Sequence, residues 1–136
     1  GSTLDPFLKE TGINPSRIVV YNLWRRFDQD GVDTPFAVCD KRSVSEKELI
    51  PTDLFNYLPD QPEALTVEIC QSSHSESHKW YFYPEMTKDE VLMFKTYDSD
   101  EKPFIPTLHS AFDYPDTPQG VTPRESIEVR AVCFFD

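Results

Sequence analysis

Proline is the residue that most limits how this chain can fold. The sequence has 136 residues, of which 12 are proline and only 4 are glycine, and the prolines are spread along its whole length. A proline inside a helix removes a hydrogen bond and clashes with the preceding turn, so these positions divide the chain into short segments. Long helices are therefore disfavoured over most of the sequence, and a fold of short β-strands is expected.

The segments between the prolines have the composition of strands. β-branched and aromatic residues concentrate in seven of them, and turn-forming residues flank each one. The predicted strands are residues 17–24, 35–39, 64–71, 78–83, 91–97, 107–112 and 126–135. This number of short strands with irregular loops predicts a mainly β, antiparallel sandwich or jelly roll.

The last predicted strand has the clearest pattern. Its apolar residues alternate with polar ones at its start, so one face is apolar and Glu128 and Arg130 begin the other. The apolar face consists of Ile127, Val129, Ala131, Cys133 and Phe135. Because Val132 and Phe134 make the second face apolar as well, the strand is expected to be half-buried at its start and more fully buried at its end.

Helical signals are brief. A serine or threonine followed three residues later by glutamate has the spacing of a capping box, and this occurs at 45–48 and again at 87–90. Residues 1–12 predict another short helix, with Pro6 in its first turn and Gly12 at its end. Each of the three is expected to form only one or two turns.

The net charge of the chain limits the kinds of molecule that it is expected to bind. The 13 basic and 24 acidic residues give a formal net charge of −11, a field that repels phosphate backbones and anionic membranes. No apolar stretch approaches the roughly 20 residues that cross a bilayer, and no secretory leader is visible. We expect a single domain over residues 1–136, in the cytoplasm, without nucleic-acid or membrane partners.

The cysteines support the same location. Cys39, Cys70 and Cys133 are odd in number, far apart and without a C-x-x-C pair. Neither a disulfide framework nor a cysteine zinc site is indicated. They are interpreted as buried thiols in a reducing compartment.

Histidine is scarce, and His109 is the most informative of the three. It lies near the middle of a predicted strand, where an imidazole could project into a barrel as a metal ligand. The alternative is a core histidine satisfied by a carbonyl, and position alone favours that alternative.

Arg124 and Ser126 occupy alternate positions at the opening of the last strand, so their side chains are expected to point together. A guanidinium fork beside a hydroxyl suits a small carboxylate, because the fork binds both oxygens and the hydroxyl adds a third bond. An exposed ion pair of Arg124 with a neighbour such as Glu128 is the alternative.

An aromatic strand supplies further pocket candidates. In residues 78–83, His78, Trp80 and Phe82 share one face, and Tyr81 and Tyr83 share the other. One face must line the core or a pocket. His78, Trp80, Tyr81 and Tyr83 are therefore candidate pocket residues, although plain packing is the commoner role of such a strand.

Five ordered segments together resemble one family. They are Asn-Leu-Trp-Arg at 22–25 and the segments 38–44, 78–99, 109–113 and 124–130. The chain resembles the gibberellin-desaturase and cephamycin-hydroxylase-like Fe(II)/2-oxoglutarate-dependent oxygenases of secondary metabolism over residues 17–135. The resemblance implies a double-stranded β-helix (jelly roll) and O2-dependent hydroxylation or desaturation of a small natural product.

The resemblance also implies roles for site residues. In this family an early His-x-Asp pair and a distal histidine hold the iron, and an Arg-x-Ser after the distal histidine holds the far carboxylate of 2-oxoglutarate. His109 matches the distal histidine, and Arg124 and Ser126 match the Arg-x-Ser. A cupin-like metal enzyme without 2-oxoglutarate is disfavoured by this same pair.

The sequence departs from the family in one important way. No histidine precedes His74, so the His-x-Asp pair has no match, and Arg26 stands where the family often has proline. The chain could be the C-terminal part of a longer enzyme, with a jelly roll incomplete at its N-terminus, which is the interpretation we favour. It could be an inactive pseudo-oxygenase that stabilises a partner in a homo- or hetero-oligomer. The third alternative, in which His74 and His78 replace the missing ligands, is the weakest, because a serine-rich loop does not hold such a pair in register.

Overall fold

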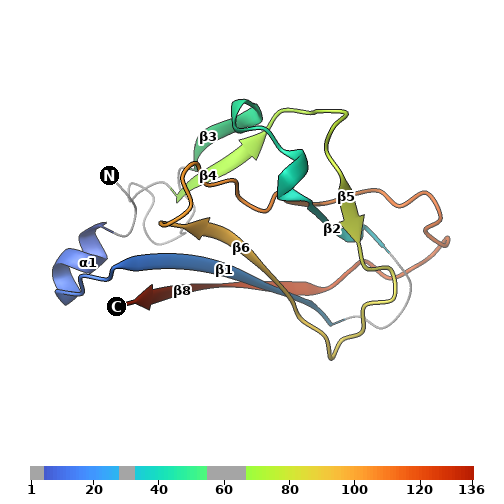
Figure 1. Ribbon diagram of the computed structural model, residues 1–136. Helices are drawn as coiled ribbons and strands as arrows, with labels where there is room; N and C mark the ends of the chain where they lie inside the picture. Colours follow the sequence, from blue (N-terminus) through green and yellow to red (C-terminus); the bar gives the residue numbers. More distant parts are fainter. Residues whose placement is uncertain (1–4, 28–32, 55–66) are drawn as a thin grey trace.

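The computed structural model describes residues 5–27, 33–54 and 67–136, and short strands dominate them (Figure 1). The helical elements are α1 (Asp5–Thr11) and the 3-10 turns η1 (Lys41–Ser43) and η2 (Glu46–Glu48). The strands are β1 (Arg17–Arg26), β2 (Phe36–Cys39), β3 (Leu49–Leu54), β4 (Val67–Ser72), β5 (Trp80–Phe82), β6 (Leu92–Asp98), β7 (His109–Ala111) and β8 (Ser126–Phe135). None of the described helices is long and apolar enough to cross a membrane.

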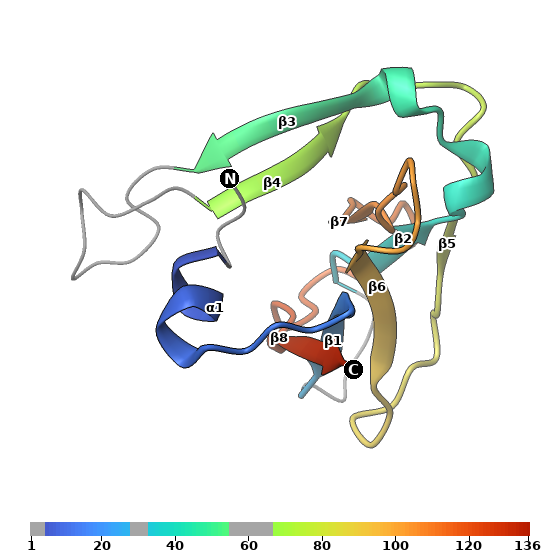
Figure 2. The same cartoon turned by 60° about the vertical axis from the view of Figure 1, so that its left-hand side comes forward.

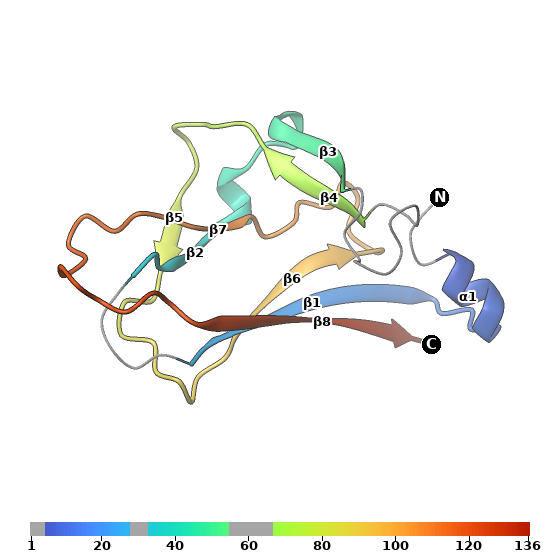
Figure 3. The same ribbon diagram turned by 180° about the vertical axis from the view of Figure 1, so that it is seen from behind.

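The strands form three antiparallel sheets with the orders β6-β1-β8, β5-β2-β7 and β3-β4. The long strand β1 is central to the first sheet and pairs with β8 along its full length (Figure 3). In Figure 2 the β3–β4 pair runs across the top of the view, above β1, β6 and β8. The prediction of a mainly β, antiparallel fold is confirmed.

Most predicted elements are present, with one strand missed and one helix absent. Strand β3 has a weak β composition because it contains Pro51 and Asp53, but Pro51 is tolerated because β3 pairs only with β4 among the described strands. Helix α1 ends as predicted at Gly12, whose φ of +69° suits glycine. The capping box at 45–48 begins η2, whereas 87–90 forms only a turn, so that predicted helix is wrong. The predicted strand at 64–71 lies partly outside the described residues.

The main core joins the first two sheets. Trp24, Met86 and Phe94 are buried together, and Phe36 and Val38 of β2 pack against them. The rings of Trp24 and Phe36 are stacked, with centroids 4.5 Å apart and planes inclined by 12°. The face of β1 that carries Trp24 therefore lies against β2, in the manner of a sandwich.

Strand β8 differs from the prediction. Ile127 and Val129 are 48% and 53% exposed, and Val132, expected to be buried, is 38% exposed. The physical reason is that β8 is an edge strand, which pairs only with β1 among the described strands. The prediction is therefore wrong in both parts: residues 126–130 are exposed rather than half-buried, and Val132 and Phe135 in the second half are exposed as well.

The cysteines are only partly as expected. All three are free thiols, as predicted. Cys39 is buried, Cys133 is partly buried and Cys70 is exposed on β4, so the expectation of three buried thiols is wrong for Cys70.

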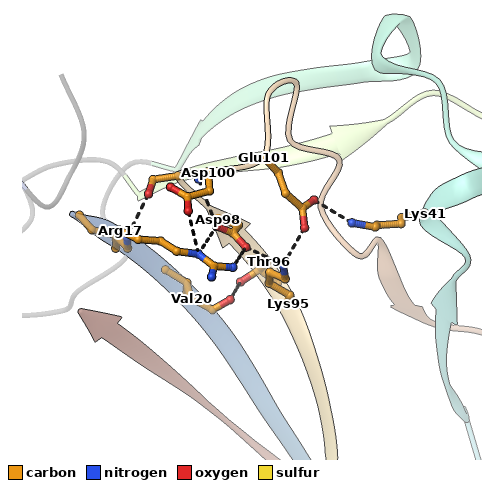
Figure 4. A network of polar contacts seen from close by, with 10 residues as sticks. Arg17, Val20, Lys41, Lys95, Thr96, Asp98, Asp100 and Glu101 are labelled. Atoms are coloured by element: carbon orange, nitrogen blue, oxygen red, sulfur yellow. Dashed lines mark hydrogen bonds and ion pairs between the residues drawn. The ribbon is translucent and has the colours of Figure 1, made fainter. Parts of the chain in front are cut away.

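An ion-pair network secures the start of β1 (Figure 4). Arg17 donates to both carboxylate oxygens of Asp98, from Nε at 2.9 Å and from Nη2 at 2.6 Å. Lys95 Nζ bridges Asp98 at 2.6 Å and Glu101 at 2.7 Å, and Lys41 Nζ bonds the second oxygen of Glu101 at 2.7 Å. The network links β1, β6 and η1, and the side chain of Asp98 at its centre is fully buried.

Candidate functional site

Strand β7 places His109 between the two larger sheets. Its backbone pairs with Val38 of β2, and its ring lies 5.6 Å from the Phe36 ring and 4.7 Å from the Phe94 ring of β6. Nδ1 lies 3.0 Å from the carbonyl oxygen of Thr107, which only accepts hydrogen bonds, so Nδ1 carries the proton in the neutral ring. Nε2 then keeps its lone pair, the form in which an imidazole binds a metal.

A carboxylate faces that nitrogen from β8. Glu128 Oε2 lies 4.0 Å from His109 Nε2. The other carboxylate oxygen, Oε1, accepts a hydrogen bond of 2.6 Å from Asn22 Nδ2, and Thr96 Oγ1 donates to Asn22 Oδ1 at 2.8 Å. Asn22 is fully buried, so this chain of polar contacts holds Glu128 from the inside of the sheet.

The register of β1 and β8 explains why these residues meet. Trp24 pairs with Glu128 and Asn22 pairs with Arg130, so all four side chains belong to the same face of the sheet. Sequence reasoning missed Asn22 and treated Glu128 only as an ion-pair partner of Arg124. The one signal that could have revealed them is the strand register, which a single sequence does not contain.

Arg124 lies just before β8 and buries a side-chain donor that has no partner among the described residues. Its backbone N–H donates to Asp33 Oδ2 at 3.1 Å, and its Nη1 donates to the carbonyl of Thr34. The guanidinium carbon lies 5.4 Å from the centre of the Trp24 ring. Arg124 Nε is buried and has no hydrogen-bond partner within the described residues, so one donor is free to bind a ligand.

Ser126 is the first residue of β8, and it pairs with Arg26 of β1. It is exposed, and Arg124 precedes the strand, so strand alternation does not relate the two side chains directly. The structure therefore gives Ser126 an arginine neighbour that was not anticipated from the sequence.

A cavity of about 210 Å³ opens beside Arg124. Its walls come from β1, β2, β5, β6 and the segments before β2, after β5 and before β8. Its lining includes Trp24, Arg26, Phe36, Tyr81, Tyr83 and Arg124. Tyr81 and Tyr83 line this cavity, whereas Trp80 lies outside its lining and is 45% exposed.

The stacked rings of Trp24 and Phe36 connect this cavity to His109. Arg124 lies over the Trp24 ring, and His109 packs against the Phe36 ring. Both aromatic residues also line the cavity. His109 and Arg124 are thus linked through the stacked rings of Trp24 and Phe36. A molecule bound in the cavity would be needed to make polar contacts with both of them.

The other two histidines are engaged elsewhere. His78 Nε2 lies 3.0 Å from Glu48 Oε2, and the His78 side chain is only 4% exposed. Hydrogen bonds from the Ser45 backbone, from Ser75 and from His78 lower the pKa of the Glu48 carboxyl to about 2. His78 is therefore held by Glu48, outside the lining of the cavity.

His74 is exposed and pairs with Glu76 at 3.2 Å. Over the described part of the chain, no three His, Cys, Asp or Glu side chains form a group that could hold one metal ion. The arrangement gives no support to the alternative in which His74 and His78 complete an iron site with His109.

Comparisons with known proteins agree with this geometry. A family model described as an oxidoreductase/YMDC permease-like domain matches residues 7–134. The solved structure of the iron and alpha-ketoglutarate-dependent endoperoxidase NvfI superposes with a TM-score of 0.75 at 36% identity, over 88% of this chain and 43% of that one. The chain belongs to the hydroxylase/desaturase family of Fe(II)/2-oxoglutarate-dependent dioxygenases of fungal secondary metabolism. The predicted family and the double-stranded β-helix fold are thereby confirmed.

Curated relatives point the same way. The Fe(II)/2-oxoglutarate-dependent dioxygenase nvfI of Aspergillus novofumigatus is 35% identical over 119 residues, which are 88% of this chain and 41% of that protein. The hydroxylase/desaturase CTB9 of Cercospora beticola is 32% identical over 131 residues, which are 91% of this chain and 39% of that protein. The chain therefore spans about two fifths of the length of these relatives.

Proposed function

We propose that this chain carries the distal-histidine part of a non-haem Fe(II)/2-oxoglutarate-dependent oxygenase that hydroxylates or desaturates a small natural product with O2. The observation that carries the proposal is the state of His109. Its Nδ1 is committed to the Thr107 carbonyl, so its Nε2 presents a lone pair between two packed sheets. A neutral imidazole held in this way is the usual form of a histidine ligand.

The cosubstrate would be held by Arg124 and Ser126. The buried, unpartnered Nε of Arg124 is the donor that a carboxylate would satisfy, and it lies beside the cavity. When bound, iron and 2-oxoglutarate supply the oxidation of an unactivated C–H bond. The residues of this chain orient the ligands and exclude water, with Tyr81 and Tyr83 at the cavity as candidate contacts for substrate.

The proposal treats residues 1–136 as one domain and as the C-terminal part of a longer jelly-roll enzyme. The share of the relatives that it covers supports this, because roughly three fifths of nvfI and of CTB9 lies outside the match. The His-x-Asp pair, for which the sequence has no match upstream of residues 22–25, would come from that remainder.

An anaerobic titration with Fe(II) and 2-oxoglutarate tests the proposal. With the remainder that supplies the His-x-Asp pair present, a visible charge-transfer band of the chelate should appear and should be lost in His109→Ala. His74→Ala is the matched control, because His74 is 83% exposed and pairs only with Glu76 in the described part of the chain. A band that persists in His109→Ala, or no band in any variant, would contradict catalysis by this chain.

The second candidate is an inactive pseudo-oxygenase that stabilises a partner subunit. The exposed apolar residues of β8 favour it, since Ile127 and Val129 would gain from being covered. A pseudo-oxygenase would give no chelate band but would raise the melting temperature of an active oxygenase with which it associates. The reverse pattern, a band without such stabilisation, supports the enzyme.

A further inference from the structure

A second arginine lines the cavity beside Arg124. Arg26 is the last residue of β1, and it belongs to the lining of the same cavity. It lies on the face of β1 that carries Trp24, because side chains two residues apart in a strand point to the same side. Two arginines, one from β1 and one from the segment before β8, therefore border one cavity.

The lining of this cavity is positive, although the chain as a whole is negative. The formal net charge of −11 repels a dianion such as 2-oxoglutarate, so a site for it needs local positive charge. Among the described residues, the lining contains one acidic side chain, that of Asp33. Its Oδ2 already accepts from the backbone N–H of Arg124 at 3.1 Å and from Thr34 Oγ1 at 3.4 Å. The two arginines thus outnumber the acidic residue, and the cavity favours an anion.

The size of the cavity indicates that both arginines serve the same ligand. Its volume of about 210 Å³ lies below the roughly 300–1,000 Å³ that is typical of pockets for drug-sized ligands. A small dicarboxylate fits this range, whereas a natural product together with a cosubstrate would need more space. One molecule of the size of 2-oxoglutarate would therefore lie between Arg26 and Arg124.

Ser126 does not have the position that Arg26 has. The two residues pair across the sheet, but Ser126 is exposed and lies outside the cavity lining. Arg26 therefore brings a hydrogen-bond donor to the cavity at the level of the sheet where the serine hydroxyl was expected.

We propose that Arg26 and Arg124 together hold the far carboxylate of 2-oxoglutarate. A carboxylate offers about four lone-pair sites on its two oxygens, enough to accept hydrogen bonds from two guanidinium groups. Arg26 stands where the resembling family often has proline, which has no side-chain donor, so this contact is particular to the present chain. The inference rests on the proposed function and extends it, because it adds a cosubstrate contact that matching to the family does not supply.

Binding of glutarate to the metal-free, full 136-residue chain tests the assignment. Glutarate keeps both carboxylates of 2-oxoglutarate but lacks the keto group, so its binding does not depend on iron. Trp24 lines the cavity, and the guanidinium carbon of Arg124 lies 5.4 Å from its ring centre, so Trp24 fluorescence reports occupancy. The second tryptophan, Trp80, lies outside the lining, and Trp80→Phe removes its signal.

In the chain that carries Trp80→Phe, Arg26→Gln should raise the Kd for glutarate by about tenfold, because a charge-assisted contact is lost. Arg26→Lys should recover part of the affinity, since lysine returns the charge without the planar fork. Arg25→Gln is the matched control, because it removes the same charge from the neighbouring residue, which lies outside the lining. It should leave the Kd unchanged, and circular dichroism verifies that each variant is folded.

Three results would overturn the proposal. An equal Kd in Arg26→Gln and in its parent would leave the carboxylate to Arg124 without Arg26. Equal weakening in Arg26→Gln and Arg25→Gln would show only an effect of net charge. Absence of any response to glutarate in the parent would contradict a carboxylate receptor in this cavity.

The outcomes separate this inference from the proposed function. Glutarate binding that requires Arg26, without any chelate band of Fe(II) and 2-oxoglutarate, would keep the two-arginine receptor and contradict the oxygenase. A chelate band whose requirement for 2-oxoglutarate is unchanged in Arg26→Gln would leave the oxygenase intact and remove Arg26 from the receptor.

Discussion

The charged groups at the two ends of strand β1 differ in whether they have partners. At its start, Arg17 and its neighbours form a network in which each charge meets an opposite charge (Figure 4). At its end, Arg25 Nε and the nearby Arg124 Nε are buried without hydrogen-bond partners among the described residues. A satisfied cluster therefore lies at the start of β1, and two arginine donors without partners among the described residues lie near its end.

This difference indicates that the two ends of β1 have different roles, one in stability and one in binding. A buried donor without a partner costs about 1–3 kcal/mol, which the fold bears unless a ligand supplies the missing acceptor. Arg124 is next to a cavity, so a ligand can reach it. We infer that the start of β1 stabilises the fold, whereas its end is kept available for binding.

The largest effect is expected at Asp98, the centre of the satisfied cluster. Asp98→Asn removes the charge that Arg17 and Lys95 share, in a side chain that is fully buried. Loss of one partner of a buried ion pair leaves the others uncompensated, so we expect the melting temperature to fall by about 10 °C. Thermal unfolding followed by circular dichroism measures the change.

Asp100→Asn is the control for this substitution. Asp100 also contacts Arg17, at 3.5 Å, but its side chain is 61% exposed, and exposed pairs contribute little. A drop of similar size in both variants would show that burial is not what makes the cluster stabilising.

Acid should destabilise the fold at two places, the cluster around Asp98 and the Glu48–His78 pair. Hydrogen bonds from Arg17 and Lys95 hold the pKa of the Asp98 carboxyl far below its usual range, and the pKa of Glu48 falls from 4.5 to about 2. A carboxyl whose pKa is lower in the folded state contributes stability above its unfolded pKa and loses it as pH falls through the folded value. The melting temperature should therefore decline from about pH 4.5 and continue to decline to about pH 2.

Asp98→Asn should make this decline shallower, since one of the responsible carboxyls is gone. Melting curves between pH 2 and pH 7 compare the two proteins. Parallel pH profiles would assign the acid sensitivity to other carboxyls.

The sequence was sufficient to predict those elements that are marked by residues within the element itself. The alternation of residues 126–135 located β8 to the residue, and Gly12 marked the end of α1. Strand β3 was missed because its segment contains Pro51 and Asp53, and only its pairing with β4 makes it a strand. The exposure of Val132 was mispredicted because apolar sequence does not show whether another layer covers an edge strand.

The residues of the candidate site also differ in whether the sequence could identify them. His109 and Arg124 could be identified from residue type and from family resemblance. Glu128 and Asn22 could not, because their contact depends on the register between β1 and β8, which are separated by about a hundred residues. A contact of this kind is a property of the folded sheets, so the spacing of residues along the chain does not reveal it.

A smaller effect, on binding, is expected at Arg124. Arg124→Ala should raise the 2-oxoglutarate concentration for half-saturation of the chelate band by about 10- to 100-fold, because a charged hydrogen-bond donor contributes about 1.5–3 kcal/mol. Folding should change little, because Arg124 lies outside the strands.

Arg25→Ala is the matched control, since Arg25 also buries an unpartnered Nε but lies outside the cavity lining. It should leave the requirement for 2-oxoglutarate unchanged. If Arg124→Ala unfolds the chain while the folded fraction binds the cosubstrate normally, Arg124 is a structural residue and the contrast between the two ends of β1 fails.

The smallest effect is expected at Ser126. Its hydroxyl is an uncharged donor, and one further hydrogen bond from it to a carboxylate already held by Arg124 contributes about 1 kcal/mol. Ser126→Ala should therefore raise the half-saturating 2-oxoglutarate concentration by about fivefold in the same titration, and Ser126→Thr should restore it by returning the hydroxyl. Since Ser126 pairs with Arg26 across the sheet, an unchanged requirement in Ser126→Ala together with a raised one in Arg26→Ala would transfer the second contact to Arg26. The ligand would then be held by two arginines, Arg124 and Arg26.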